Sequence, residues 1–391
     1  MGAPLDGYAP DLAGLRADVE ALASLARDSA GAGERAAASL VRDRLALAGA
    51  REARVEAYRG RATYGWSFAA HALAGAAGIA RGGAAGRALA LGALWSLERD
   101  VSGRPLWRMR RGGGGTGAGA VARVPARAEA RGTIVLVAHL DAARTGLVWH
   151  PAVTRLGAAR HLRRRRVDAF LGPVAAALVA GALGPRRARA PAVAMLGATA
   201  ALNLQVARGA TVPGANDNAT GVAVLLDLVR ALAADPLPHA DVLVACPGGE
   251  EAGMGGMGAF LRAHAGALHP ARTLVIGLDT LGSGTPIVAA AEGALREHRY
   301  READLEIADE GAALAGLPAP HRWRIGGWTD PLLALHAGLP AISILSMGPG
   351  YFPGYHHPTD VPAGVAWDSV IACARLAAGT VAAAHRRLAG A

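Results

Sequence analysis

The sequence predicts an α/β fold, a three-layer α/β/α sandwich around a mostly parallel mixed sheet, with apolar helical insertions. From Thr133 onward, short continuous apolar runs alternate with segments of helical periodicity, which is typical of βα units. The apolar runs are bounded by turn residues, as expected of strands buried on both faces. Acidic and histidine side chains follow the ends of these runs, where ligands collect in open α/β sheets.

Two amphipathic helices are predicted before the first strand. Apolar residues recur at three- and four-residue spacing in Leu12–Arg27 and Glu34–Ala48, and turn-forming residues separate the two segments. A short strand is predicted at Val55–Tyr58. The glycine-rich stretch Gly112–Gly117 is expected to be a flexible linker rather than a phosphate-binding loop, because no strand is predicted directly before it.

Four buried strands and four helices are predicted in the rest of the chain. The strands are Ile134–Ala138, Val242–Cys246, Leu274–Leu278 and Ala341–Leu345. The helices are Val222–Ala233, Met257–Ala265, Pro331–Ala337 and Trp367–Leu388. The first three helices supply crossovers between strands, and the last is a C-terminal helix.

Positive charge is concentrated in one segment. The formal net charge is +10, and every one of the 41 basic residues is arginine. Ten arginines and one acid, Asp168, lie between Arg155 and Arg208, so the rest of the chain is close to neutral. Because this charge brackets apolar sequence and aromatic residues are few, we expect no nucleic-acid partner. The absence of lysine excludes Schiff-base chemistry and a P-loop lysine.

Four apolar segments interrupt the predicted α/β pattern: Thr63–Ala80, Ala88–Leu97, Ala169–Leu183 and Ala190–Ala207. A membrane-spanning helix needs about 20 mostly apolar residues, and these segments are shorter and rich in alanine and glycine. Arginines crowd their ends and can extend their reach by snorkelling. We therefore predict membrane association through transmembrane helices, with Arg163–Arg166 and the catalytic part on the cytoplasmic side. The alternative is a helical cap on the soluble domain, or a dimer interface.

Few features bear on the cellular compartment. The stretch Met1–Pro10 has no basic region and no apolar core, so no signal peptide is predicted. Two cysteines, Cys246 and Cys373, are too few for a disulfide framework or a cysteine-built zinc site. Both observations suit a cytoplasmic catalytic part, whether membrane-associated or free.

The predicted organisation has a catalytic domain with two insertions. Residues 1–62 form the N-terminal helical part of that domain, and residues 119–147 and 210–391 form the remainder. Residues 63–97 are an apolar helical insertion. Residues 148–209 are an Arg-flanked apolar helical insertion, and membrane association is predicted through segments 63–97 and 169–207.

Ligand-type side chains follow the four predicted strands and occupy the turn-rich loop before helix Val222–Ala233. They are His139, Asp217, Glu250, Glu251, Asp279 and His356. Singly, each has an ordinary explanation, such as a hydrogen-bonded histidine, a turn cap or a solvated acidic loop. At one rim of one sheet, however, such carboxylates repel one another unless cations neutralise them. Imidazole and carboxylate ligands without thiolate suit zinc, with manganese or cobalt as substitutes. A bridging carboxylate would hold two ions about 3.5–4 Å apart.

The motifs together resemble a known family. They are His139-Leu-Asp141, Gly214–Gly221, Glu250-Glu251-Ala-Gly253, Asp279 and Tyr355-His356-His357-Pro358-Thr359-Asp360. This series is similar to that of the co-catalytic (di-zinc) aminopeptidase family, which includes bacterial leucine-type aminopeptidases and glutamate carboxypeptidase-like zinc peptidases. The resemblance implies a zinc exopeptidase-like fold, a strand at Gly119–Val124, two Zn²⁺ ions and a peptide or aminoacyl substrate.

The resemblance also implies a role for each ligand. Asp217 would bridge two zinc ions, His139 and Asp279 would complete one site, and Glu251 and His356 would complete the other. Glu250 would be the general base of peptide hydrolysis.

Further roles follow from the same resemblance. Asp141 would accept a hydrogen bond from the imidazole of His139, and Asp360 would likewise support a ligand. The side chains of Tyr351, Tyr355 and Asp330 would contact the substrate or stabilise the oxyanion.

Two departures from the family pattern concern the substrate pocket. Pro331 stands after Thr329-Asp330, where the family usually has histidine, and the insertion between Asp141 and Asp217 is far longer than an ordinary loop. Side-chain preference is therefore not carried over from the family.

Three functions are compatible with these motifs. A di-zinc aminopeptidase is the first. A one-zinc glutaminyl cyclase-like transferase on the same fold is the second, although the intact His139 and Asp279 favour two metals. A non-catalytic membrane or interaction module is the third, but such relatives usually lose ligands or the general base, and none is missing here.

Overall fold

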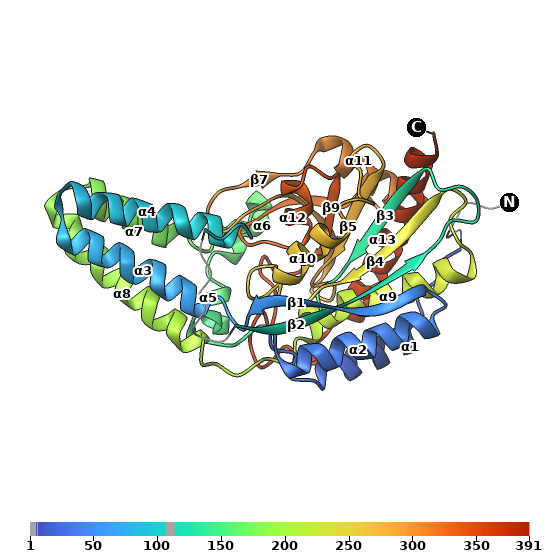
Figure 1. Ribbon diagram of the computed structural model, residues 1–391, viewed down its shortest axis with the longest axis horizontal. Helices are drawn as coiled ribbons and strands as arrows, with labels where there is room; N and C mark the ends of the chain where they lie inside the picture. Colours follow the sequence, from blue (N-terminus) through green and yellow to red (C-terminus); the bar gives the residue numbers. More distant parts are fainter. Residues whose placement is uncertain (1–4, 6, 107–113, 391) are drawn as a thin grey trace.

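The computed structural model describes residues 5, 7–106 and 114–390. An α/β body is built on one nine-stranded sheet, and a helical arm extends from it (Figure 1). The strands are β1 (Arg51–Arg61), β2 (Gly114–Val124), β3 (Gly132–Val137), β4 (Ala240–Cys246), β5 (Thr273–Leu278), β6 (Thr285–Glu292), β7 (His298–Arg299), β8 (His321–Ile325) and β9 (Ala341–Met347). The α-helices are α1 (Leu12–Ala23), α2 (Ala32–Leu47), α3 (Gly65–Arg81), α4 (Gly83–Val101), α5 (Pro151–Thr154), α6 (Ala158–Arg164), α7 (Gly172–Leu183), α8 (Arg189–Val206), α9 (Thr220–Ala234), α10 (Gly255–Ala263), α11 (Glu302–Leu314), α12 (Pro331–His336) and α13 (Trp367–Gly390).

The sheet is mixed, with order β1-β2-β4-β3-β5-β9-β6-β7 and β8 paired to β6. The central strands β4, β3, β5 and β9 are parallel. On one side β2 pairs antiparallel with both β1 and β4, and on the other β6 pairs antiparallel with both β9 and β7. The predicted α/β fold is confirmed, but parallel pairing is confined to the centre and to the β6–β8 pair.

Helices cover both faces of the sheet and bury its apolar side chains. Helices α2, α9 and α13 pack on one face, while α10 and α12 pack against the strands from the other (Figure 1). Side chains such as Ile134 and Leu136 of β3, Leu225 of α9 and Leu376 of α13 are almost fully buried in the shared core. The continuous apolar runs noted in the sequence are therefore the strands enclosed on both faces.

Several elements differ from the sequence prediction. Gly114–Gly117 belongs to β2 and pairs with Tyr58–Arg61 of β1, so this part of the predicted linker is an edge-strand ladder, while Gly112 and Gly113 lie outside the described residues. Strands β6, β7 and β8 and helix α11 were not predicted. Strands β7 and β8 contain polar residues, as in His321–Ile325, because they lie at the sheet edge and are only partly covered. Strand β6 is mostly buried between β9 and these two strands, but it begins with Thr285-Pro286, and proline is uncommon in interior strands.

Helices α3, α4, α7 and α8 pack on one another as the arm (Figure 1). They share a second hydrophobic cluster that includes Phe68, Ile79, Leu178 and Leu196. Glycine allows the helices to approach closely: a Cβ at Gly75 would lie 2.2 Å from Leu178 Cδ2. The two predicted insertions, distant in sequence, thus form one structure.

The arm helices do not match the transmembrane prediction. Within the described ranges, no helix combines the length and the apolar character that crossing a bilayer requires. Helix α7 has 12 residues, and α4 reaches 19 residues only by including Arg87 and the charged stretch Glu98–Asp100. The alanine and glycine residues of these segments allow the arm helices to pack on each other.

We predict opposite effects for one substitution at two glycines. A methyl group at Gly277 of β5 would lie 2.2 Å from Pro331 Cγ of α12, so Gly277→Ala is expected to lower the free energy of unfolding by about 1–3 kcal/mol. Gly197 in α8 has no neighbour within 4 Å of such a methyl group, and Gly197→Ala is expected to raise it by about 0.5–1 kcal/mol. Urea unfolding followed by circular dichroism measures both. Equal shifts in the two variants would contradict the close β5–α12 contact.

Candidate metal centre

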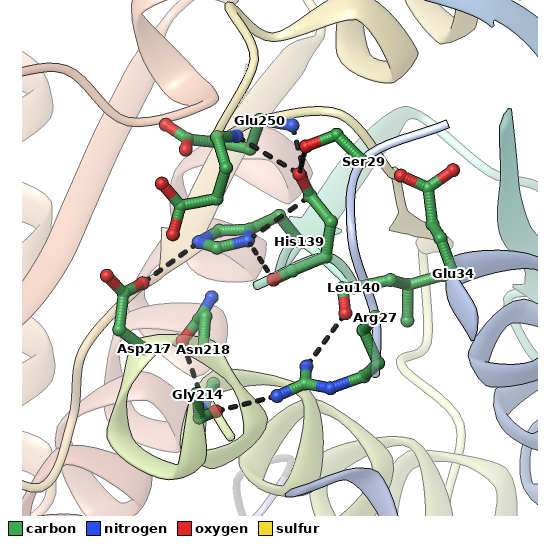
Figure 2. Close-up of polar contacts among 12 residues, drawn as sticks. Arg27, Ser29, Glu34, His139, Leu140, Gly214, Asp217, Asn218 and Glu250 are labelled. Atoms are coloured by element: carbon green, nitrogen blue, oxygen red, sulfur yellow. Dashed lines mark hydrogen bonds and ion pairs between the residues drawn. The ribbon is translucent and has the colours of Figure 1, made fainter. Parts of the chain in front are cut away.

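The predicted ligands meet beyond the carboxyl ends of the central strands. His139 lies just after β3, Asp279 directly after β5, and His356 in the loop after β9. The pair Glu250-Glu251 follows β4, and Asp217 lies in η3 (Ala215–Ala219), the irregular turn that leads into α9. All of these side chains are buried. Figure 2 shows the ring of His139 directed at the carboxylate of Asp217.

Asp217 is central to the cluster because its two carboxylate oxygens face different imidazoles. Its Oδ1 lies 3.3 Å from His139 Nε2, and its Oδ2 lies 3.3 Å from His356 Nε2. His139 Nε2 is also 3.8 Å from Asp279 Oδ2, and His356 Nε2 is 3.0 Å from Glu251 Oε2. Each imidazole is therefore paired with Asp217 and one further carboxylate.

Several polar atoms of the cluster are suited to coordinate a divalent cation. Glu251 Oε1 and His356 Nδ1 are buried without a hydrogen-bond partner among the described residues, and His356 Nε2 lies close to two carboxylates without a well-aligned hydrogen bond to either. Leaving such atoms unpaired costs about 1–3 kcal/mol each. Ligand atoms of His139, Asp217 and Glu251 all lie within 4.8 Å of one another. Carboxylate oxygen and imidazole nitrogen, without thiolate, are donors that zinc accepts.

Burial and mutual repulsion disfavour the ionised form of several carboxylates in this region, whereas desolvation of Asp217 is outweighed by hydrogen bonding to His139 and His356, which lowers the pKa of Asp217. Eight buried acids surround the site: Asp141, Asp217, Glu250, Glu251, Asp279, Glu292, Asp330 and Asp360. Desolvation raises the pKa of Glu250 well above its ordinary value, and that of Glu251 to about 7. It likewise raises the pKa of Asp279 to about 6. A bound cation would remove this penalty.

The same surroundings favour the charged form of the two imidazoles. Desolvation opposes their protonation, but the neighbouring carboxylates outweigh it. Hydrogen bonding to Asp141 and Asp217 raises the pKa of His139 well above its ordinary value. The charge of Glu251 contributes most to raising the pKa of His356 to about 10. The cluster thus attracts positive charge strongly.

The carboxylate of Asp141 holds the Glu250-Glu251 loop. It accepts hydrogen bonds from the backbone N–H groups of Glu250 (3.0 Å) and Glu251 (3.1 Å) and from the hydroxyl of Ser29 (2.6 Å). His139 Nδ1 is nearer to the Asp141 carbonyl oxygen, at 3.2 Å, than to its carboxylate, at 3.5 Å. The predicted support of His139 therefore comes first from the backbone of Asp141.

Two asparagines anchor the loop on either side of Asp217. Asn216 Oδ1 accepts from the N–H of Gly282, and its Nδ2 donates to Ser283 Oγ. Asn218 Oδ1 accepts from the N–H of Thr280, and its Nδ2 donates to the carbonyl of Leu278. Both amides bind the segment after β5, so the Asn-Asp-Asn order leaves only the middle carboxylate facing the site.

Asp360 fixes the same loop from the opposite side. Its carboxylate accepts from the backbone N–H groups of Asn216 (2.7 Å) and Asp217 (3.1 Å). Because Asp360 lies four residues after His356, it connects the loop of one ligand to the loop of another. The supporting position predicted from the sequence thus acts on the backbone of Asp217.

The fully buried Arg27 was missed by sequence reasoning. Its guanidinium donates to the carbonyl oxygens of Leu140, Pro213 and Gly214 at 2.7–2.8 Å. Figure 2 shows the bonds to Leu140 and Gly214. Arg27 therefore joins the His139–Asp141 segment to the Asp217 loop. Burial lowers its pKa to about 10, and the charge of Asp141 opposes this shift most. Arginine is too common in this chain for one buried residue to be recognised from sequence.

The arm insertions contribute an aromatic wall beside the site. Trp149, at the end of η1 (Leu147–Trp149), stacks on Phe170 with ring centroids 4.8 Å apart. It also packs edge-to-face with the rings of Tyr355 and His356, at ring-centroid distances of 5.4 Å and 4.3 Å. Its indole N–H donates to the hydroxyl of Tyr64 at 3.1 Å. A ligand-type histidine is thus packed by Trp149 of the second insertion, and Tyr64 of the first insertion holds that indole.

The remaining residues near the site differ in their burial and in their contacts. Asp330 is buried, and neither carboxylate oxygen has a hydrogen-bond partner in the described part of the chain. Desolvation raises its pKa well above the ordinary value. Tyr355 stacks on His356 at 3.8 Å. Tyr351 instead lies under the guanidinium of Arg155, 5.5 Å from ring to cation. His357 is partly exposed, and its Nδ1 lies 2.9 Å from Thr359 Oγ1.

Solved structures of zinc aminopeptidases share this fold. The aminopeptidase from Aneurinibacillus sp. strain AM-1 superposes with a TM-score of 0.57 at 13% identity, over 96% of this chain and 94% of that one. BSAP, a zinc aminopeptidase from Bacillus subtilis, gives a TM-score of 0.56 at 14% identity, over 95% and 94%. A leucine aminopeptidase precursor from Bacteroides thetaiotaomicron VPI-5482 gives 0.55 at 13% identity, over 95% and 96%.

Fold, family match and site together define a zinc metallopeptidase. Residues 199–381 match the model of Peptidase family M28. The match includes Asp217, Glu250, Glu251, Asp279 and His356, whereas His139 precedes it. No curated protein shows significant sequence similarity to the chain.

We predict that Arg27→Met lowers the free energy of unfolding by about 3–5 kcal/mol, because it removes a buried cation and leaves three carbonyl oxygens without donors. Arg59→Met at an exposed position is the matched control and should be neutral. Chemical denaturation gives the difference, and metal analysis should show reduced zinc retention in the Arg27 variant alone. Equal stability of the two variants would exclude the connecting role of Arg27.

Proposed function

We propose that this chain is a di-zinc aminopeptidase that hydrolyses the N-terminal peptide bond of its substrate. The observation that carries the proposal is the position of Asp217, whose two oxygens each face a separate imidazole and carboxylate pair. A carboxylate so placed is suited to bridge two cations. The structural neighbours, which are aminopeptidases, support the same reaction.

Two ligand sets follow from the pairing of side chains. His139 and Asp279 would hold one zinc with Asp217, and Glu251 and His356 would hold the other with Asp217. When bound, zinc supplies Lewis acidity that polarises a carbonyl and acidifies water. Manganese and cobalt accept the same ligands.

Glu250 is the proposed general base. Its backbone N–H donates to Asp141, and the charges of His139 and Glu251 act on its carboxylate. Among the described residues no imidazole forms an ion pair with that carboxylate, so it is left for proton transfer. It would accept a proton from the attacking water and deliver it to the leaving amine. Desolvation raises the pKa of Glu250, which favours its holding a proton between these two transfers.

The residues around the reaction centre restrict the substrate. Trp149 and Tyr355 form an aromatic wall against His356, and we propose that this wall positions the substrate beside the metals. Asp330 adds a buried acid whose oxygens are free to accept hydrogen bonds from the substrate, and Tyr355 is the proposed oxyanion donor. Tyr351 is directed at Arg155, so its predicted contact with the substrate requires a different side-chain position.

Glu250→Gln is expected to lower kcat for an aminoacyl amide by about 10²–10⁴-fold while zinc content stays unchanged, because only the proton-accepting oxygen is replaced. Chromogenic aminoacyl amides measure kcat, and elemental analysis measures zinc. Glu129→Gln, at an exposed position, is the control. Undiminished turnover of the Glu250 variant would remove this residue from the catalytic role.

Zinc content is expected to be two ions per chain. Asp217→Asn should lower the occupancy of both sites, whereas Asp279→Asn should affect chiefly one, because only Asp217 lies between the imidazoles. Since bound zinc requires neutral imidazoles, zinc affinity should fall as the pH is lowered. Elemental analysis after dialysis measures both. A stoichiometry of one would favour a glutaminyl cyclase-like transferase, which a cyclisation assay on an N-terminal glutaminyl peptide would detect.

A further inference from the structure

The outer end of the arm carries exposed apolar side chains. It consists of the α3–α4 turn and the α7–α8 turn, residues 81–89 and 179–190, which we call the arm tip (Figure 1). The two turns are adjacent, because a Cβ at Gly82 would lie 3.2 Å from Arg189 Nη1. Leu183, Leu89 and Val179 are 61%, 45% and 42% exposed. Single exposed aliphatic residues are ordinary, but these three belong to two adjacent turns.

The same tip is strongly basic. It contains Arg81, Arg87, Arg186, Arg187 and Arg189, which lie at or near the helix ends. Residues 62–97 and 169–216 contain no aspartate or glutamate. The acids of the arm helices, Glu98 and Asp100, lie at the opposite end of α4, so they do not balance the positive charge of the tip. The tip thus contrasts with the acidic site at the arm's base.

We propose that the arm tip docks on an anionic lipid surface, with Leu183 and Leu89 entering the headgroup region and the arginines contacting lipid phosphates. Exposed aliphatic residues combined with arginines are the composition of interfacial membrane-binding segments. Arginine keeps its charge at the headgroups while its aliphatic stem adds apolar contact. A nucleic acid would use the arginines but leave the leucines in water, so lipid accounts for both features.

The position of the tip suits this contact. The arm projects from the α/β body, and its base carries the aromatic wall of Trp149 beside His356 (Figure 1). Docking at the outer end would leave the carboxyl ends of the central strands, and the ligand residues there, away from the membrane. This inference does not depend on catalysis and can be tested whether or not the chain hydrolyses peptides.

The test is flotation of the full chain with vesicles. Phosphatidylcholine vesicles containing phosphatidylserine should carry the protein, and pure phosphatidylcholine vesicles should not. Arg186→Gln with Arg187→Gln should weaken binding about 25-fold, from about fivefold per arginine near an anionic surface. Raising the salt concentration should weaken the binding of the unaltered chain. Leu183→Asn with Leu89→Asn should also weaken it, because apolar insertion is lost.

The matched control is Arg262→Gln with Arg272→Gln, which removes the same charge at exposed positions of the body. It should bind vesicles as the unaltered chain does. If both arginine double variants lost vesicle binding equally, the binding would depend on net positive charge alone, and the proposal would be overturned. Failure of the unaltered chain to float with anionic vesicles would also overturn it. Sedimentation without lipid tests a second occupant. If the unaltered chain formed dimers and the leucine double variant did not, the tip would bind a second copy of the chain, and the lipid proposal would be overturned.

Discussion

Carboxylates crowded into a low-dielectric interior repel one another, and the centre of this protein is organised around that repulsion. Asp217, Glu251 and Asp279 would be costly to keep ionised together without added positive charge. Two imidazoles and Arg27 supply part of it. The positive charge that is still lacking is the physical reason to expect divalent cations. Their binding would also explain why buried oxygen and nitrogen atoms remain without hydrogen bonds where the side chains converge.

Holding this arrangement requires that few backbone groups move. Arg27 ties two ligand loops together through three carbonyl oxygens. Asp360 binds the N–H groups at Asn216 and Asp217, and the two neighbouring asparagines bind the segment after β5. These supports come from different elements, so the ligands are placed by the folded sheet rather than by any single loop. Such preorganisation is what a catalytic metal site needs.

The helical arm is the part of the chain that departs most from an α/β sandwich. Its helices share a hydrophobic cluster separate from the main core, yet Trp149 at its base packs on the ring of His356. The arm thus joins two surfaces of different character: an acidic, buried centre at the base and a basic, exposed tip. Its alanine and glycine content reflects helix packing, because Gly75 approaches Leu178 more closely than a larger residue would allow.

Much of the centre could be predicted from sequence, because its chemistry is carried by residues in recognisable motifs. His139, Asp217, Glu250, Glu251, Asp279 and His356 follow buried apolar strands, and the sheet necessarily brings such strand ends together. The edge strands β7 and β8 could not be predicted, since partial cover removes the continuous apolar pattern. Pro286 near the start of the buried strand β6 concealed that strand, and helix α11 was missed as well. The burial of Arg27, the stacking of Trp149 on His356 and the union of two insertions in one arm were decided only by the tertiary structure. Each depends on contacts between residues far apart in the chain, and local sequence does not specify which distant side chain will fill a given space.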